Sequence, residues 1–141
     1  MSRTTSWQNI VQYADADTND SDKTQTVPAA TQWVLLSIWV ELITTVTVGN
    51  RQVDVLITDA SDNAICKAVA GAVQAASLTR VYIFAPLNPQ ETGFTNTVMF
   101  RSLPQGLALP AGYKVRVYDS AAIAAAADDM TVRILVDERS E

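Results

Sequence analysis

The sequence QWVLLSIWVELIT, residues 32–44, is the longest apolar run in the chain. Side chains alternate between the two faces of a β-strand, so this run predicts a strand with two different faces. One face is purely aliphatic and suited to a core: Val34, Leu36, Ile38, Val40 and Leu42. The other face combines Trp33, Leu35, Ser37, Trp39, Glu41 and Ile43. That second face is more apolar than a solvated face should be, and we expect something to cover it.

Short apolar runs separated by turn residues continue after this strand. Gly49-Asn50 predicts a hairpin turn into the next strand. The alanine-rich stretch 64–76 could be a helix, but its β-branched residues and Gly71 favour a strand followed by a loop. Strands are expected over 24–27, 32–44, 51–58, 64–76 (in part), 78–85, 94–103, 113–119 and 130–136. About eight short strands without a long helix are typical of an all-β antiparallel β-sandwich or jelly roll, here over residues 23–141.

Residues 1–22 differ from this domain and predict an N-terminal arm or linker. An apolar patch that includes Trp7, Ile10, Val11 and Tyr13 precedes the polar run ADADTNDSD. Such an arm could dock on its own domain or on a neighbour, and a frayed terminus is the alternative. DADTND resembles the start of a calcium-binding EF-hand loop. The loop's glycine is replaced by Asp20 and its final glutamate by Thr26, so we expect no metal site.

Composition excludes several classes of function. The chain has 141 residues, a formal net charge of −5 and no histidine. An acidic chain is poorly suited to direct nucleic-acid binding, and the commonest general base and metal ligand is missing. No stretch has the roughly 20 apolar residues that a membrane-spanning helix needs, and the N-terminus does not resemble a signal peptide. With one cysteine, Cys66, and no disulfide framework, we expect a protein made in a reducing cytoplasm.

No group of residues predicts catalysis or a cofactor site. Asp128 and Asp129 are adjacent, so on a strand their carboxylates would point to opposite faces; we expect a polar turn whose carboxylates accept backbone N–H bonds. Cys66 has no histidine to activate it and is expected to be a buried structural thiol. The chain has no glycine-rich phosphate loop. We therefore predict that this protein is not an enzyme.

The aromatic residues of the long strand allow two interpretations. Two tryptophans on one face could stack on a carbohydrate, or they could anchor a protein interface, where tryptophan is enriched. The flanking Leu35 and Ile43 favour the interface, because a carbohydrate platform would place hydroxyl-binding polar residues there. The predicted interface residues are Trp7, Ile10, Val11, Tyr13, Trp33, Leu35, Trp39 and Ile43.

Several phrases between about residues 27 and 137 resemble small tailed-phage structural proteins, in particular capsid cement (decoration) proteins with a jelly-roll fold. They include VGNRQ (48–52), GAVQAASLTR (71–80), LPAGYKVRVYD (109–119) and ADDMTVR (127–133). The resemblance implies a virion protein on the capsid surface that binds the major capsid protein and itself, as a dimer or trimer. A carbohydrate-binding sandwich of a tail or fibre, and a head-tail joining or tail accessory protein, remain alternatives.

Overall fold

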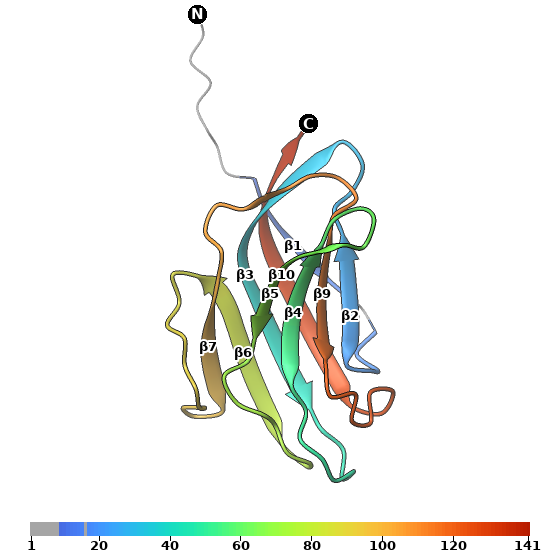
Figure 1. The fold of residues 1–141 in the computed structure, drawn as a ribbon, viewed down its shortest axis with the longest axis vertical. Coiled ribbons are helices and arrows are strands. Elements are labelled where there is room, and N and C mark those ends of the chain that lie inside the picture. Colours follow the sequence, from blue (N-terminus) through green and yellow to red (C-terminus); the bar gives the residue numbers. More distant parts are fainter. Residues whose placement is uncertain (1–8, 16) are drawn as a thin grey trace, which may run out of the picture.

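The structure is a computed structural model that describes residues 9–15 and 17–141. Its regular elements are β-strands arranged in two sheets, which confirms the predicted all-β sandwich (Figure 1). The strands are β1 (Ile10–Ala14), β2 (Asp22–Thr26), β3 (Thr31–Ile43), β4 (Val53–Thr58), β5 (Ala64–Val69), β6 (Thr79–Pro86), β7 (Val98–Leu103), β8 (Ala108–Leu109), β9 (Lys114–Asp119) and β10 (Asp129–Ser140).

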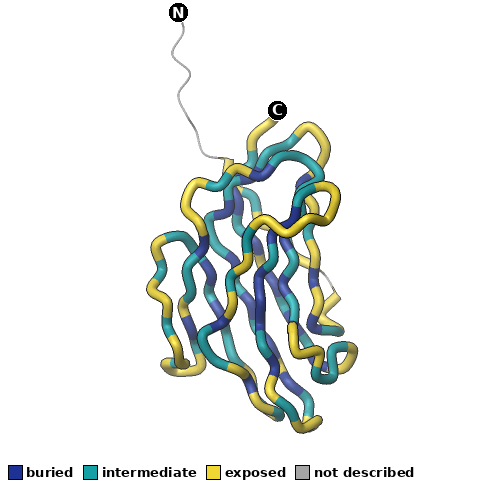
Figure 2. The backbone as a smooth tube through the Cα atoms, in the orientation of Figure 1, coloured by how far each residue is buried: buried dark blue, intermediate teal, exposed yellow. Residues whose placement is uncertain are grey.

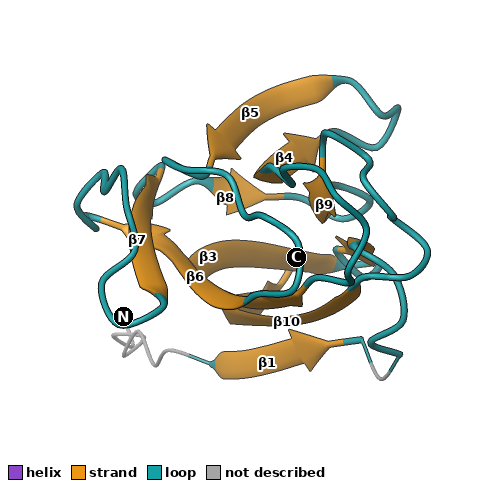
Figure 3. Ribbon diagram, turned by 90° about the horizontal axis from the view of Figure 1, so that it is seen from below, coloured by secondary structure: helices purple, strands orange, loops and turns teal. Residues whose placement is uncertain are grey.

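The two sheets are built from nested antiparallel pairs. The first sheet has the order β1-β10-β3-β6-β7, with β8 beside β3, and the second has the order β2-β9-β4-β5. Strand β1 therefore pairs with β10, β2 with β9, β3 with β6 and β4 with β5. This is the arrangement of a long folded ribbon rolled into a sandwich, as in a jelly roll. In Figure 3, β4, β5 and β9 lie over β3, β6 and β10.

Two details differ from the expectation for a simple antiparallel sandwich. Strand β7 runs parallel to β6, so residues 87–97 carry the chain back to the other end of the sheet. The hairpin predicted at Gly49-Asn50 is wrong, because β3 and β4 belong to different sheets. The turn residues are correct there, but local sequence does not reveal which sheet the next strand will join.

A β-bulge in β3 changes which side chains of this strand face the core. Ser37 lies opposite Leu135 of β10, and Leu35 lies opposite the next residue, Val136, so Leu36 is an additional residue in the ladder. Beyond the bulge Ile38, Val40 and Leu42 are buried, as predicted, whereas before it Trp33 and Leu35 are the buried residues. The assignment of Trp33 and Leu35 to the outward face is therefore wrong. The extra residue shifts the alternation by one position.

The core lies between the sheets and combines aliphatic and aromatic side chains. Tyr82 and Phe84 of β6 are fully buried beside the residues of β3, and Val115 and Val117 of β9 meet them from the second sheet. Figure 2 shows that buried positions follow the strands, while exposed positions gather in the connections at the two ends. The alternating burial along β9 follows from the strand period of two.

The free edge of β7 is covered by side chains from the preceding loop. The backbone N–H of Phe100 donates to Glu91 Oε1 at 2.8 Å, and that of Ser102 donates to Gln90 Oε1 at 3.2 Å. The N–H of Glu91 donates to the carbonyl of Phe100 at 3.1 Å. The amides of Phe100 and Ser102, which an added strand would need, are thus already bonded.

A buried ion pair joins the connections at one end of the sandwich. Arg51 and Asp128 are both fully buried, and the guanidinium donates to the two carboxylate oxygens at 2.8 and 3.1 Å. Arg51 also donates to the carbonyls of Thr47 and Gly49, and Asp128 accepts the N–H of Thr45. Asp128 therefore accepts a backbone bond from the other connection, whereas the prediction was a bond from a nearby amide of its own turn, and it balances a buried cation 77 residues away.

We expect Asp128→Ala to lower the free energy of unfolding by about 3–5 kcal/mol, because it leaves the Arg51 guanidinium buried without a counter-charge. The matched control is Asp62→Asn, which removes the charge of the exposed partner of Lys114, tolerates the positive φ of this position and should cost about 1 kcal/mol or less. Urea denaturation followed by circular dichroism measures both. Similar values for the two variants would contradict the assigned role of the buried pair.

Candidate protein interface

The outward-facing side of the first sheet is apolar across its central strands. Strand register places Trp39 of β3 beside Ile83 of β6, which lies beside Phe100 of β7. Parallel rows contain Val81 beside Val98, and Ser37 beside Leu135. We call this surface the apolar outer face; its members are Ser37, Trp39, Glu41, Ile43, Val81, Ile83, Val98, Phe100, Thr131, Arg133 and Leu135. Ile43 and Phe100 are 43% and 37% exposed.

The outward-facing side of the second sheet has the opposite character. Its rows contain Thr24, Arg116, Leu56 and Lys67, and Thr26 beside Lys114. Arg116 forms a two-point ion pair with Asp22 at 2.7 and 2.8 Å, and Lys67 pairs with the buried Asp54. This is a conventional solvated face. Ile65 and Val69 of the edge strand β5 are also exposed, at 47% and 38%, but the central strand β9 carries Lys114 and Arg116 outward. The first sheet is therefore the one whose outer face is apolar across its central strands, and we expect a partner there.

The predicted interface residues separate into three groups. Trp39 and Ile43 lie on the apolar outer face, as expected. Trp33 and Leu35 are buried in the core and cannot contact a partner directly. Ile10, Val11 and Tyr13 lie in β1 at the edge of the first sheet, and Trp7 lies outside the described residues. The expected interface role of the accessible residues stays a prediction.

Part of the predicted arm docks on the domain itself. Residues 10–14 form β1, which pairs with β10, and Tyr13 packs against the ring of Trp33 with 4.6 Å between ring centroids. Both the Tyr13 hydroxyl and the Trp33 indole N–H donate to Glu138 Oε1. The bond to this carboxylate and burial raise the pKa of Tyr13. Trp33 is thus an anchor for β1, while the boundary predicted at residue 22 stays a prediction.

Most residues of the apolar outer face were not predicted from the sequence. Val81, Ile83, Val98, Phe100 and Leu135 are brought together by strand pairing between distant segments. A signal was present in TRVYIF, residues 79–84, where alternation leaves apolar residues on both faces of the strand. In a two-layer sandwich each strand turns only one face toward the core, so the second apolar face of this strand must point outward.

A second apolar surface lies at the end of the sandwich that contains Arg51. Val46 and Val48 in the β3–β4 connection are 83% and 91% exposed, and Ile123 of the β9–β10 connection lies against Gly49. We call Val46, Val48 and Ile123 the loop end. Buried charges hold both connections: Arg51 binds the first, and Asp119 accepts the N–H groups of Gln52, Ala121 and Ile123. The backbone that carries the side chains of the loop end is therefore held in place by hydrogen bonds.

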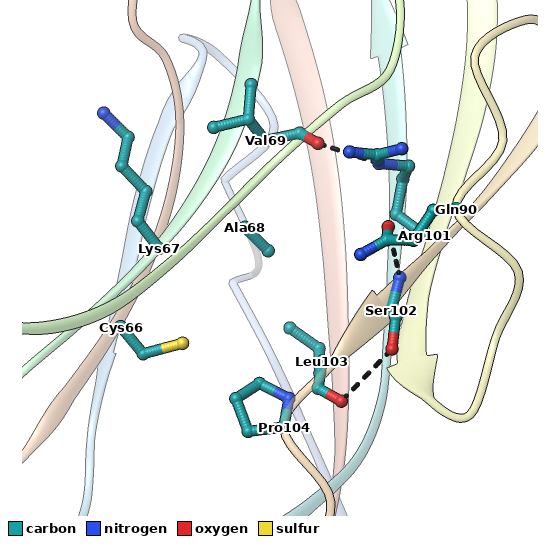
Figure 4. Close-up of a pocket in the computed structure, with 9 residues that line it drawn as sticks. All are labelled: Cys66, Lys67, Ala68, Val69, Gln90, Arg101, Ser102, Leu103 and Pro104. Atoms are coloured by element: carbon teal, nitrogen blue, oxygen red, sulfur yellow. Dashed lines mark hydrogen bonds between the residues drawn. The ribbon is translucent and has the colours of Figure 1, made fainter.

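A pocket lies between β5 of the second sheet and β7 of the first. It has a volume of about 530 Å³ and is lined by Cys66, Lys67, Ala68, Val69, Gln90, Arg101, Ser102, Leu103 and Pro104 (Figure 4). Arg101 Nε is used in a bond to the carbonyl of Val69 at 2.9 Å. Burial raises the pKa of the Cys66 thiol, which opposes nucleophilic activation.

A smaller pocket of about 350 Å³ lies on the second sheet, between Thr24, Leu56, Thr58, Asp62, Lys114 and Arg116. Its two cations are already paired with Asp62 and Asp22. Within residues 9–15 and 17–141, no group of three or more His, Cys, Asp or Glu side chains is placed to hold a metal ion. The same residues contain no helix long and apolar enough to cross a membrane.

Comparisons with known proteins give little beyond this geometry. No family model and no curated protein matches the sequence. A chain from the structure of infectious bursal disease virus, Gx strain, is 9% identical with a TM-score of 0.38 over 96% of this chain and 32% of its own length, so the present chain spans about a third of it. A turnip yellow mosaic virus chain is 12% identical with a TM-score of 0.34 over 100% of this chain and 85% of its own. Neither likeness is close enough to carry an argument.

The two tryptophans of β3 should differ sharply in their contribution to stability. Trp33→Ala opens a cavity in the core and removes the anchor of β1, so we expect a loss of about 3–5 kcal/mol in the free energy of unfolding. Trp39→Ala removes a side chain from the outer face and should cost about 1 kcal/mol or less. Equal losses in urea denaturation would show that the two side chains do not occupy opposite faces.

The pocket environment of Cys66 predicts slow alkylation. Because burial raises its pKa, a smaller fraction of the thiol is ionised in the folded chain than in the unfolded chain at the same mildly alkaline pH. We expect iodoacetamide to label Cys66 several-fold more slowly in native buffer than in urea, as followed by intact-mass spectrometry. A folded-state rate equal to or above the rate in urea would contradict this environment.

Proposed function

We propose that this chain is a structural, non-enzymatic virion protein that binds the outside of a phage capsid and cements neighbouring major capsid subunits. The observation that supports the proposal is the contrast between the central strands of the two sheets: on one outer face they carry ion pairs, and on the other the strands carry apolar side chains that include the exposed Ile43 and Phe100. A surface of this kind is stabilised by burial against another protein. The resemblance of residues 27–137 to phage cement proteins supplies the identity of that protein, the major capsid protein.

Two separate apolar surfaces fit a bridging role better than one would. The apolar outer face and the loop end are carried by different parts of the sandwich, so a single copy can contact two neighbours at once. The loop end is the surface we assign to the shell, because its valines are the most exposed large apolar side chains in the described chain. Its backbone is fixed by Arg51 and Asp119, which reduces the entropy lost when it docks.

The polar groups of the protein support a structural role as well. The buried Arg51–Asp128 pair and the buried Asp119 are bonded to backbone or to each other, with no substrate position between them. Two observations weigh against the carbohydrate-binding alternative, which needs accessible tryptophan rings. Trp33 is buried, and the guanidinium of Arg133 lies over the Trp39 ring, 4.6 Å from its centre, where a sugar would stack. A head-tail joining or tail accessory role differs from the proposal only in position on the particle.

Binding to capsids tests the proposal directly. We expect the purified protein to co-sediment with capsids of the phage that encodes it, and to raise the temperature at which those capsids release their DNA. Val46→Asp together with Val48→Asp should weaken co-sedimentation at least about tenfold, because charged side chains would have to be desolvated at the contact. The matched control is Thr24→Asp together with Thr26→Asp, which adds two charges at exposed positions of β2 on the second sheet and should leave binding unchanged.

The position of the protein in the particle decides among the structural alternatives. Cryo-EM of virions should show copies distributed over the outer capsid surface at subunit boundaries. Density confined to the head-tail junction or to the tail would contradict the cement role. Absence of the protein from purified virions by mass spectrometry would contradict any structural virion role.

A further inference from the structure

Two opposite charges stand unpaired in the centre of the apolar outer face. Glu41 belongs to β3 and Arg133 to the neighbouring strand β10, and neither forms an ion pair with a described residue. Arg133 lies opposite Trp39 in the ladder and its guanidinium lies over that ring. Glu41 lies two residues further along β3, so the carboxylate and the guanidinium are diagonal neighbours on one surface.

We propose that the occupant of this face is a second copy of the chain, related by a two-fold axis, with Glu41 of each copy facing Arg133 of the other. The inference rests on the proposed function only in taking the apolar outer face to be a protein-binding surface. In a two-fold interface each residue meets its partner reciprocally, so a surface must be complementary to itself. One acid and one base beside each other meet that requirement, and a single charge would not.

The overall charge of the chain supports the choice of this face. Two copies with a formal charge of −5 each repel one another over most of their surface. The centre of the apolar outer face carries one negative and one positive group, with Asp129 at its rim beside Ile43. Two copies can therefore approach here with two cross-chain ion pairs formed inside an apolar surround, where screening is weaker than in water.

The size of the face sets the expected strength of the dimer. The face lies on four strands, β10, β3, β6 and β7, so at ~4.8 Å between strands and ~3.3 Å per residue it measures roughly 15–20 Å in each direction, or about 300 Å². That area is smaller than the patch of about 800 Å² per partner in a standard interface. We therefore expect a reversible dimer that dissociates on dilution. A permanent one is not expected. Such a dimer leaves the loop end of each copy free, so one assembly presents two loop ends to a shell.

Charge reversal with mixing tests the two-fold arrangement. Glu41→Arg gives a copy with two cations on the face, and Arg133→Glu gives a copy with two anions. Sedimentation velocity over a concentration series should show that each variant alone dimerises at least about tenfold more weakly than the wild type. An equimolar mixture of the two should form a heterodimer, because both cross-chain pairs then join opposite charges, one in the wild-type arrangement and one reversed.

The matched control reverses an ion pair on the second sheet. Asp62→Arg and Lys114→Glu change the same charges at an exposed pair, and neither should alter the dimerisation of the wild-type face. Circular dichroism and urea denaturation confirm that each variant is folded before it is compared. If Glu41→Arg does not fold, Glu41→Gln mixed with wild type serves instead, with an intermediate affinity expected.

Two outcomes would overturn the inference. One is a wild-type protein that stays monomeric at the highest concentration reached. The other is a mixture of the two variants that associates no better than either alone, since any interface without Glu41–Arg133 reciprocity behaves that way. If a monomeric variant still co-sediments with capsids, the proposed function is unaffected. If the protein dimerises as inferred but does not bind capsids, the proposed function is contradicted and this inference is not.

Discussion

The extra residue in β3 determines how the rest of the molecule is arranged. A strand of 13 residues with strict alternation would place Trp33 and Trp39 on the same side. The bulge at Leu36 separates them, so that Trp33 enters the core under β1 and Trp39 faces outward beside Arg133. One inserted residue therefore serves two purposes. It anchors the N-terminal strand, and it leaves an aromatic group at the centre of the outer face.

The buried charges at the other end of the sandwich complement this arrangement. A jelly roll moves the chain between its sheets through connections at the ends, and these connections have no ladder to satisfy their backbone groups. Here Arg51, Asp119 and Asp128 supply those bonds from within the protein. The ordered connections can then expose Val46 and Val48 without collapsing onto the core.

The class of fold and most of the strands could be predicted from the sequence, because the signals for them are local. Alternation and turn residues are local, so β9 and the second half of β3 could be predicted with the correct inward faces. The bulge could not, because an extra residue becomes visible only when β10 supplies the partner register. The Arg51–Asp128 pair and the rows of the apolar outer face join segments far apart in the chain. Local patterns in a single sequence do not reveal which distant segments pair in the fold. Trp39 and Ile43 were placed correctly because they lie beyond the bulge.

The covered edge of β7 limits the architectures that this protein can form. A sheet that grows from copy to copy needs two open edges, one to receive a strand and one to offer the next. In the first sheet the β7 edge is occupied by Gln90 and Glu91, and β8 is only two residues long, which leaves β1 as the longer remaining edge among the described strands. Pairing through β1 alone ends after two copies, so fibre growth along this sheet terminates at once. The protein can accumulate at high local density on a surface without polymerising through its largest sheet.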